Sequence, residues 1–192
     1  NAGHKRSVLA TILRNLKAPF AGGREIIAGT NLEYKPIDIS GSANQYRTER
    51  GWFGDNQFTF KDLPTGEQRL GGVLYDIYNF PTSPVPTCVM LGPGVPNDLP
   101  EEVRGISVNQ KADALFFLQT AKLDWRRNDQ EVREGRQFEM ARYIVHYADG
   151  QLVDIPIYAE IDIDNWRQTT PMAIAGAQIA WVKQYEGTDQ WA

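Results

Sequence analysis

The clearest pattern of hydrophobic and polar positions lies at residues 138–158, where two alternating runs flank the pair Asp149-Gly150. This pair readily adopts the positive φ angles of a tight hairpin turn. In each run, every second side chain points to the same face of a strand. On the first run these side chains are Ala141, Tyr143, Val145 and Tyr147, and on the return run Val153, Ile155 and Ile157. The pattern therefore predicts an antiparallel hairpin with a buried face.

Short runs rich in strand-forming residues recur along most of the chain between Gly, Pro, Asn and Asp. The apolar run within 113–119 is typical of a central strand that is covered on both faces. Many short strands at even spacing favour an all-β fold, namely an antiparallel β-sandwich or jelly roll. The further predicted strands lie at 24–28, 33–39, 57–60, 71–78, 86–91, 105–109, 113–119 and 176–185.

A helix is predicted only at 5–17, where apolar residues recur at helical spacing before Pro19. We therefore expect an N-terminal helical appendage at 1–22, which would be the tail of a preceding domain, and a β-sandwich domain at 23–192. Long connections are expected at 40–56, 92–104, 120–137 and 160–175. Loops of this length are usually functional or ordered by something that binds them.

The composition of the chain narrows the range of binding partners that we expect. The 192 residues carry a net charge of -4, which argues against a nucleic-acid partner. No run reaches the apolar length of a membrane span. The single cysteine, Cys88, excludes an internal disulfide, and we expect its thiol to be buried. The chain begins without a signal peptide, so we expect a mature form or an excised piece. The residues themselves leave the compartment open.

Signals for catalysis are weak. The two histidines, His4 and His146, and one cysteine lack the spacing of a zinc site. The sequence contains neither a Gly-x-Ser-x-Gly motif nor a glycine-rich phosphate loop. A triad enzyme or a nucleotide-binding enzyme is therefore not expected.

Alternating carboxylates at 160–164 are the strongest acidic pattern. If this segment is a strand, Glu160, Asp162 and Asp164 project from one face. Three readings stay open: a solvated face with arginine partners, a calcium site, or an acid–base pair for glycoside hydrolysis. The last reading predicts that hydrolysis of a polysaccharide is lost in Asp162→Asn. A second oxygen-rich region, with Asp38 and Asn44, could also hold calcium or simply serve turns.

Tryptophans in predicted loops are the best candidates for ligand binding. Trp52, Trp125 and Trp166 stand beside Arg, Asp and Asn residues, whereas Trp181 is expected in the core. A sugar ring offers an apolar face and a rim of hydroxyls, which an indole and neighbouring polar groups can satisfy together. The alternative is that a loop tryptophan closes the end of the sandwich. The predicted ligand-binding residues are Trp52, Asp55, Asn56, Trp125, Arg126, Arg127 and Trp166.

Several motifs together cover most of 33–185. They are YKPIDISGSAN (34–44), GWFGDNQ (51–57), LPTGEQRLGGV (63–73), GISVNQKADALFFLQTA (105–121), YIVHYADG (143–150) and DNW (164–166). In order and spacing, the chain resembles the galactose-binding-like β-sandwich modules of bacterial glycoside hydrolases. Gln119 stands where such modules are expected to carry a histidine.

The resemblance implies a non-catalytic accessory module that binds carbohydrate, in an extracellular or periplasmic location. The partners would be a carbohydrate and a catalytic domain of the same polypeptide, without nucleic acid or membrane. No cofactor is expected apart from a structural calcium ion held by Asp38, Asn44, Asp162 or Asp164. Two alternatives stay open: a structural domain that buries Trp52 or Trp125 against a catalytic domain, and a glycoside hydrolase in its own right.

Overall fold

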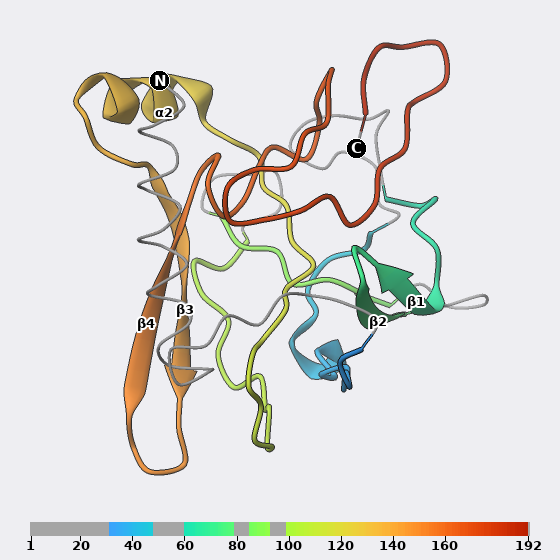
Figure 1. The fold of residues 1–192 in the computed structure, drawn as a ribbon, viewed down its shortest axis with the longest axis vertical. Coiled ribbons are helices and arrows are strands. Elements are labelled where there is room, and N and C mark those ends of the chain that lie inside the picture. The colour runs from blue at the N-terminus through green and yellow to red at the C-terminus, as the bar shows by residue number, and fades with distance from the viewer. Residues whose placement is uncertain (1–30, 48–59, 79–84, 93–98, 192) are drawn as a thin grey trace. The chain divides into compact units, whose positions relative to one another are not determined.

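Two antiparallel hairpins are the main elements of the computed structural model, which describes residues 31–47, 60–78, 85–92 and 99–191 (Figure 1). The expected antiparallel β class, with few helices, is confirmed for these residues. In chain order the elements are η1 (Ser40–Ser42), β1 (Gly66–Leu70), β2 (Val73–Ile77), α2 (Trp125–Arg133), β3 (Glu139–His146) and β4 (Leu152–Tyr158). The described residues divide into two compact units, one within 112–179 and one comprising segments of 31–111 and 180–191.

The hairpin β3–β4 confirms the prediction made from residues 138–158. Tyr143 pairs with Ile155, and Val145 pairs with Val153, as the alternation requires. Gly150 has a φ of 87°, which suits its place in the tight connection. Ala141 differs from the expectation, because it is exposed. A bulge directly before it shifts the register and lets the preceding Met140 contact the core instead.

The core of the first unit lies under the inner face of this hairpin. Its buried side chains form two neighbouring clusters: Leu123 with Phe138 and Ala159, and Ile155 with Ile157 and Ile163. Ala121 and Met140 pack against both clusters. Each fully buried isoleucine contributes about 1.5–3 kcal/mol relative to an exposed one. Residues far apart in sequence are thus held on one face of β3 and β4.

The segment 120–137, predicted as a connection, contains the helix α2. Asp124 caps its start, because the side chain accepts a hydrogen bond from the backbone N–H of Arg127 at 3.2 Å. Only Trp125 and Val132 are apolar within the helix, so the sequence shows no amphipathic repeat there. The placement of Trp125 in a loop was therefore wrong, and the capping aspartate was the available signal.

The second unit contains the hairpin β1–β2. The predicted strand 71–78 is confirmed as β2, whereas its partner β1 was not predicted. Gly71 and Gly72 join the strands with φ angles of 55° and 85°, and Leu70 pairs with Val73. A two-residue Gly-Gly loop is a known hairpin signal. This loop therefore indicates that the polar run directly before it is a strand, which is β1.

Arg47 holds together three parts of the second unit. Its guanidinium Nη1 donates to the backbone carbonyls of Phe60, Lys61 and Leu63, at 2.8, 3.1 and 3.5 Å. Its backbone N–H donates to the Thr87 hydroxyl at 3.3 Å. The tight turn at 60–63 is therefore joined to the bridge that pairs residues 45 and 88.

Five predicted strands are not strands in the structure: 33–39, 86–91, 105–109, 113–119 and 176–185. Isolated bridges at Cys88, Ala177 and Gln184 are the only ladder contacts in these segments. An apolar run such as 113–119 does not by itself distinguish a strand from other extended chain. The predicted helix 5–17, the strand 24–28 and residues 57–59 lie outside the described residues. Where the structure describes the chain, none of its helices could span a bilayer.

Candidate functional site

Trp125 is the exposed indole of the first unit, at the first position of α2. Its residue is 47% exposed, and Arg126 beside it is exposed as well. The Asp124 cap orders the backbone on which both side chains stand. An apolar ring and a guanidinium are thus presented to solvent from one rigid position.

Polar contacts secure the inner side of α2. Asn128 is 2% exposed, and its Nδ2 donates to the Glu160 carboxylate at 2.9 Å. The guanidinium carbon of Arg127 lies 4.9 Å from the centroid of the Phe138 ring, within the range of a cation–π contact. The Arg127 guanidinium is therefore engaged in a contact within the protein.

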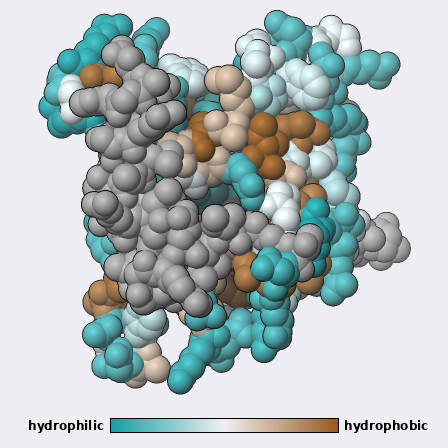
Figure 2. Space-filling view, viewed as in Figure 1, coloured by the Kyte–Doolittle hydropathy of each residue, from teal (hydrophilic) through white to brown (hydrophobic). Residues whose placement is uncertain are grey.

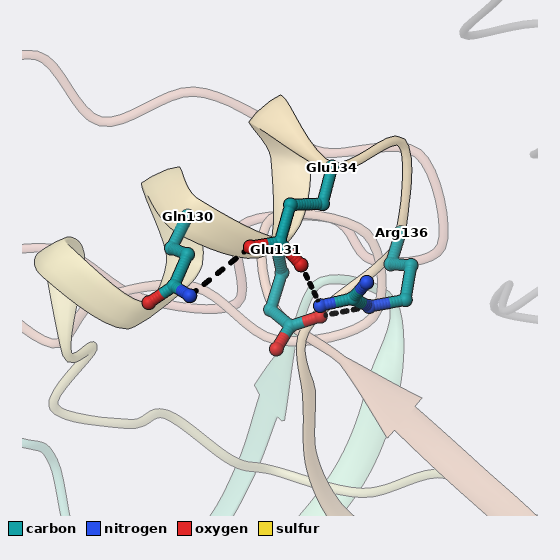
Figure 3. Close-up of polar contacts among 4 residues, drawn as sticks. All are labelled: Gln130, Glu131, Glu134 and Arg136. Carbon is teal, nitrogen blue, oxygen red and sulfur yellow. Dashed lines mark hydrogen bonds and ion pairs between the residues drawn. The ribbon is translucent and has the colours of Figure 1, made fainter.

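At the other end of α2, Arg136 folds back onto the helix (Figure 3). Its Nε lies 2.6 Å from Glu131 Oε2, and its Nη2 contacts Glu134. Gln130 donates to the same Glu134 at 3.0 Å. These hydrogen bonds lower the pKa of Glu134, with the contact from Gln130 as the largest cause. Arg136 is therefore neutralised by local carboxylates.

A stacked pair and a hydrogen-bond chain join β3 to the turn after β4. The rings of Phe117 and Tyr143 lie 3.9 Å apart at 13°. The Tyr143 hydroxyl donates to Gln119 Oε1, and Gln119 Nε2 donates to the Asp162 carbonyl at 3.2 Å. Burial raises the pKa of Tyr143 to about 12, so the phenol keeps its proton. Gln119 thus joins two segments of the unit.

The three carboxylates at 160–164 do not share a strand face, which corrects the expectation. Glu160 and Asp162 lie in the turn after β4, and Asp164 lies between the isolated bridges of Ile163 and Asn165. Glu160 contacts Asn128, and Asp164 Oδ1 accepts from the N–H of Asn165 at 2.6 Å. Asp162 is 5% exposed and its Oδ2 accepts from the backbone N–H of the last β4 residue at 2.9 Å. The three side chains therefore make separate contacts.

Asp162 is the unusual member of this group. Its Oδ1 is buried without a hydrogen-bond partner. Gly176 lies so close that a Cβ there would stand 2.7 Å from this oxygen. Burial raises the pKa of Asp162, against a smaller lowering by the hydrogen bond from the Tyr158 N–H. The position thus disfavours the ionised carboxylate.

The predicted calcium ligands of the second unit have protein partners. Asp38 Oδ1 accepts from the Ser40 N–H at 2.8 Å and from the Tyr78 hydroxyl at 3.3 Å. The Ser40 backbone bond is the largest cause that lowers the pKa of Asp38. Asn44 exchanges two hydrogen bonds with the backbone of Met90, at 2.9 and 2.8 Å. Within the described ranges, no three His, Cys, Asp or Glu side chains converge to hold a metal.

The structure separates the predicted ligand-binding residues. Trp125 and Arg126 are exposed side by side, whereas Trp166 is 6% exposed and offers no open ring face. Trp181 is not in a strand and contacts Phe60 edge to face, with 6.3 Å between centroids. The other predicted ligand-binding residues, Trp52, Asp55 and Asn56, lie outside the described residues.

Comparisons with known proteins leave the family open. No protein-family model, curated protein or solved structure matches this chain. The resemblance to galactose-binding-like modules therefore stays a prediction that depends on the motifs alone. Function has to be inferred from the chemistry of the exposed residues.

Proposed function

We propose that the chain is a non-catalytic carbohydrate-binding module of a polysaccharide-degrading enzyme, with Trp125 as its stacking platform. The observation that carries this proposal is the 47% exposure of Trp125 on a capped helix. An exposed indole on ordered backbone can stack on the apolar face of a sugar ring with little loss of entropy. Arg126 then supplies donors for hydroxyl or carboxylate oxygens.

The two hairpins would belong to the β-sandwich or jelly roll that such modules use. In such a fold the inner face of β3 and β4 would pack toward a second layer of strands. Two separate places stay proposed for a structural calcium ion: Asp162 with Asp164 in the first unit, and Asp38 with Asn44 in the second. A glycan array run with and without a chelator tests the ligand and the ion together.

Substitution of Trp125 tests the proposed binding role. In native affinity gels that contain soluble polysaccharides, the chain should be retarded, and Trp125→Ala should abolish the retardation. Leu152→Ala serves as the control, because Leu152 is 62% exposed and apolar but lies on β4. Unchanged retardation of Trp125→Ala, or no response of the native chain across a broad glycan array, would refute the role.

A second function, a structural domain that braces a catalytic domain, is favoured by exposed apolar side chains. Ile144 and Leu152, in β3 and β4, are 53% and 62% exposed, and Met172 is 67% exposed. Brown, apolar atoms also reach the surface in the view of Figure 2. A partner domain that covers them would remove this apolar area from water.

The two functions differ in a measurable way. If the chain braces a catalytic domain, it should bind a hydrophobic dye when that domain is absent. The double variant Ile144→Ser and Leu152→Ser should bind less dye, and its glycan retardation should not change. If the native chain binds no dye, the bracing function is contradicted. If it is retarded by a glycan through Trp125, the binding function stands whatever the dye shows.

A further inference from the structure

The helix α2 carries an apolar residue followed by an arginine at two places. Trp125 and Arg126 stand at its start, and Val132 and Arg133 follow seven residues later. Seven residues are nearly two full turns, so Val132 follows Trp125, and Arg133 follows Arg126, along two neighbouring rows of the helix at an axial spacing of roughly 10 Å. Val132 is 59% exposed, and both arginines are exposed. This face of α2 therefore presents an apolar group beside a cation at two successive positions.

These two arginines differ from others in the same unit. Arg136 pairs with Glu131 and Glu134, and Arg142 pairs with Glu139 and Asp154. Among the described residues, no carboxylate forms an ion pair with Arg126 or Arg133. Arg127 also lacks one, but its guanidinium contacts the Phe138 ring. Within the described residues, the charges of Arg126 and Arg133 are thus not paired with a carboxylate and can contact an external anion.

We propose that the ligand of this face is an anionic polysaccharide, whose sugar rings contact Trp125 and Val132 and whose carboxylate or sulfate groups contact Arg126 and Arg133. This inference rests on the proposed carbohydrate-binding function and adds the charge of the ligand to it. A guanidinium forms two parallel hydrogen bonds with a carboxylate or sulfate, which a neutral hydroxyl cannot match. An extended polymer with regularly spaced charges fits the repeated pair.

Asp129 lies between the two pairs, and it is exposed. Its carboxylate repels an anionic ligand, so the acidic and basic residues of α2 should affect affinity with opposite signs. Removal of its charge in Asp129→Asn should strengthen binding, whereas removal of either arginine charge should weaken it. A role of these residues in helix stability alone would not give opposite effects on affinity.

The test measures affinity of the full chain for polygalacturonate and for its fully methyl-esterified form, which has the same sugar backbone without the charge. Arg126→Gln and Arg133→Gln should each weaken binding to polygalacturonate by about two- to fivefold, as expected for an exposed ion pair. Asp129→Asn should tighten it by a similar factor. Arg104→Gln is the control, because it removes one exposed cation that pairs with Glu102 in the other unit.

The outcomes separate this inference from the proposed function. A preference for the charged polymer that both arginine variants lose, and that falls with added salt, supports it. Equal binding of the two polymers, both dependent on Trp125, overturns the inference and leaves the carbohydrate-binding function intact. If the chain binds neither polymer and also fails to bind alginate or a sulfated galactan, both the inference and the proposed function are contradicted. Equal binding of poly-glutamate, without any effect of Trp125→Ala, would show simple attraction of polyanions and overturn the inference.

Discussion

Replacement of Asp162 by Asn should change how the stability of the first unit depends on pH. In the folded chain, Asp162 is 5% exposed and its Oδ1 is buried without a partner. Burial raises the pKa of Asp162 above its ordinary value, and the Tyr158 N–H offsets only part of this effect. Asparagine keeps an oxygen that can accept from Tyr158 but cannot ionise.

The sign follows from proton linkage. At neutral pH the carboxylate is ionised in the unfolded chain, and folding moves it to a position that disfavours this charge. Because the folded pKa of Asp162 lies above the unfolded value of about 3.9, the folded state binds the proton first on acidification. The contribution of Asp162 to the free energy of unfolding therefore increases as pH falls from neutrality toward 4, then levels off. Each pKa unit of elevation corresponds to about 1.4 kcal/mol.

The assay is urea unfolding of both chains at several pH values from 7 to 4, followed by tryptophan fluorescence. Trp166 is 6% exposed in the same unit and reports its unfolding. Other carboxylates titrate in both chains, so their contributions cancel in the difference between the two curves. Asp164→Asn is the control, because its Oδ1 accepts from Asn165 and it is only half-buried. If the free energy of unfolding changes with pH in the same way in the native chain and in Asp162→Asn, the reasoning is refuted.

Three further substitutions test local packing. Gly176→Ala should destabilise the unit by about 1–3 kcal/mol in urea unfolding, since the new Cβ would stand 2.7 Å from the Asp162 carboxylate. Arg47→Met should cost about 1–3 kcal/mol and expose the turn at 60–63 to hydrogen exchange, because three carbonyls lose a donor. Asp124→Ala should cost about 0.5–2 kcal/mol and lower helical circular dichroism, because it removes the cap of α2. Unchanged unfolding midpoints would contradict the contact in question.

Turn signals for both hairpins are present in the sequence, but only the β3–β4 hairpin was predicted. Asp149-Gly150 between alternating runs specified β3–β4, including the face that becomes buried. The same rule applies to Gly71-Gly72, but the strand before it is mostly polar, so attention to apolar residues alone missed β1. A turn of fixed length sets the register of its flanking strands whatever their composition. Turn chemistry was therefore a better guide than hydrophobicity.

Other features depend on contacts that no local window contains. The helix α2 carries few apolar residues, and it is held by the buried amide of Asn128 on Glu160, which lies 32 residues away. Trp166 stands among polar neighbours in sequence, yet tertiary packing buries it. The sequence patterns of Trp125 and Trp166 are alike, with an Asp one or two residues before the indole and an Arg directly after it. Only the fold distinguishes the exposed indole from the buried one.

This difference explains why the proposed site centres on α2. A binding residue has to be exposed and ordered at once, and these demands usually conflict, because burial is what orders a side chain. The helix resolves the conflict by burying Asn128 on one side while Trp125 and Arg126 stay in solvent. Loss of the Asn128–Glu160 contact should therefore weaken glycan binding, although neither residue belongs to the proposed ligand contacts. Rescue by Asn128→Gln combined with Glu160→Asp, which exchanges the side-chain lengths, would distinguish this positioning role from direct contact.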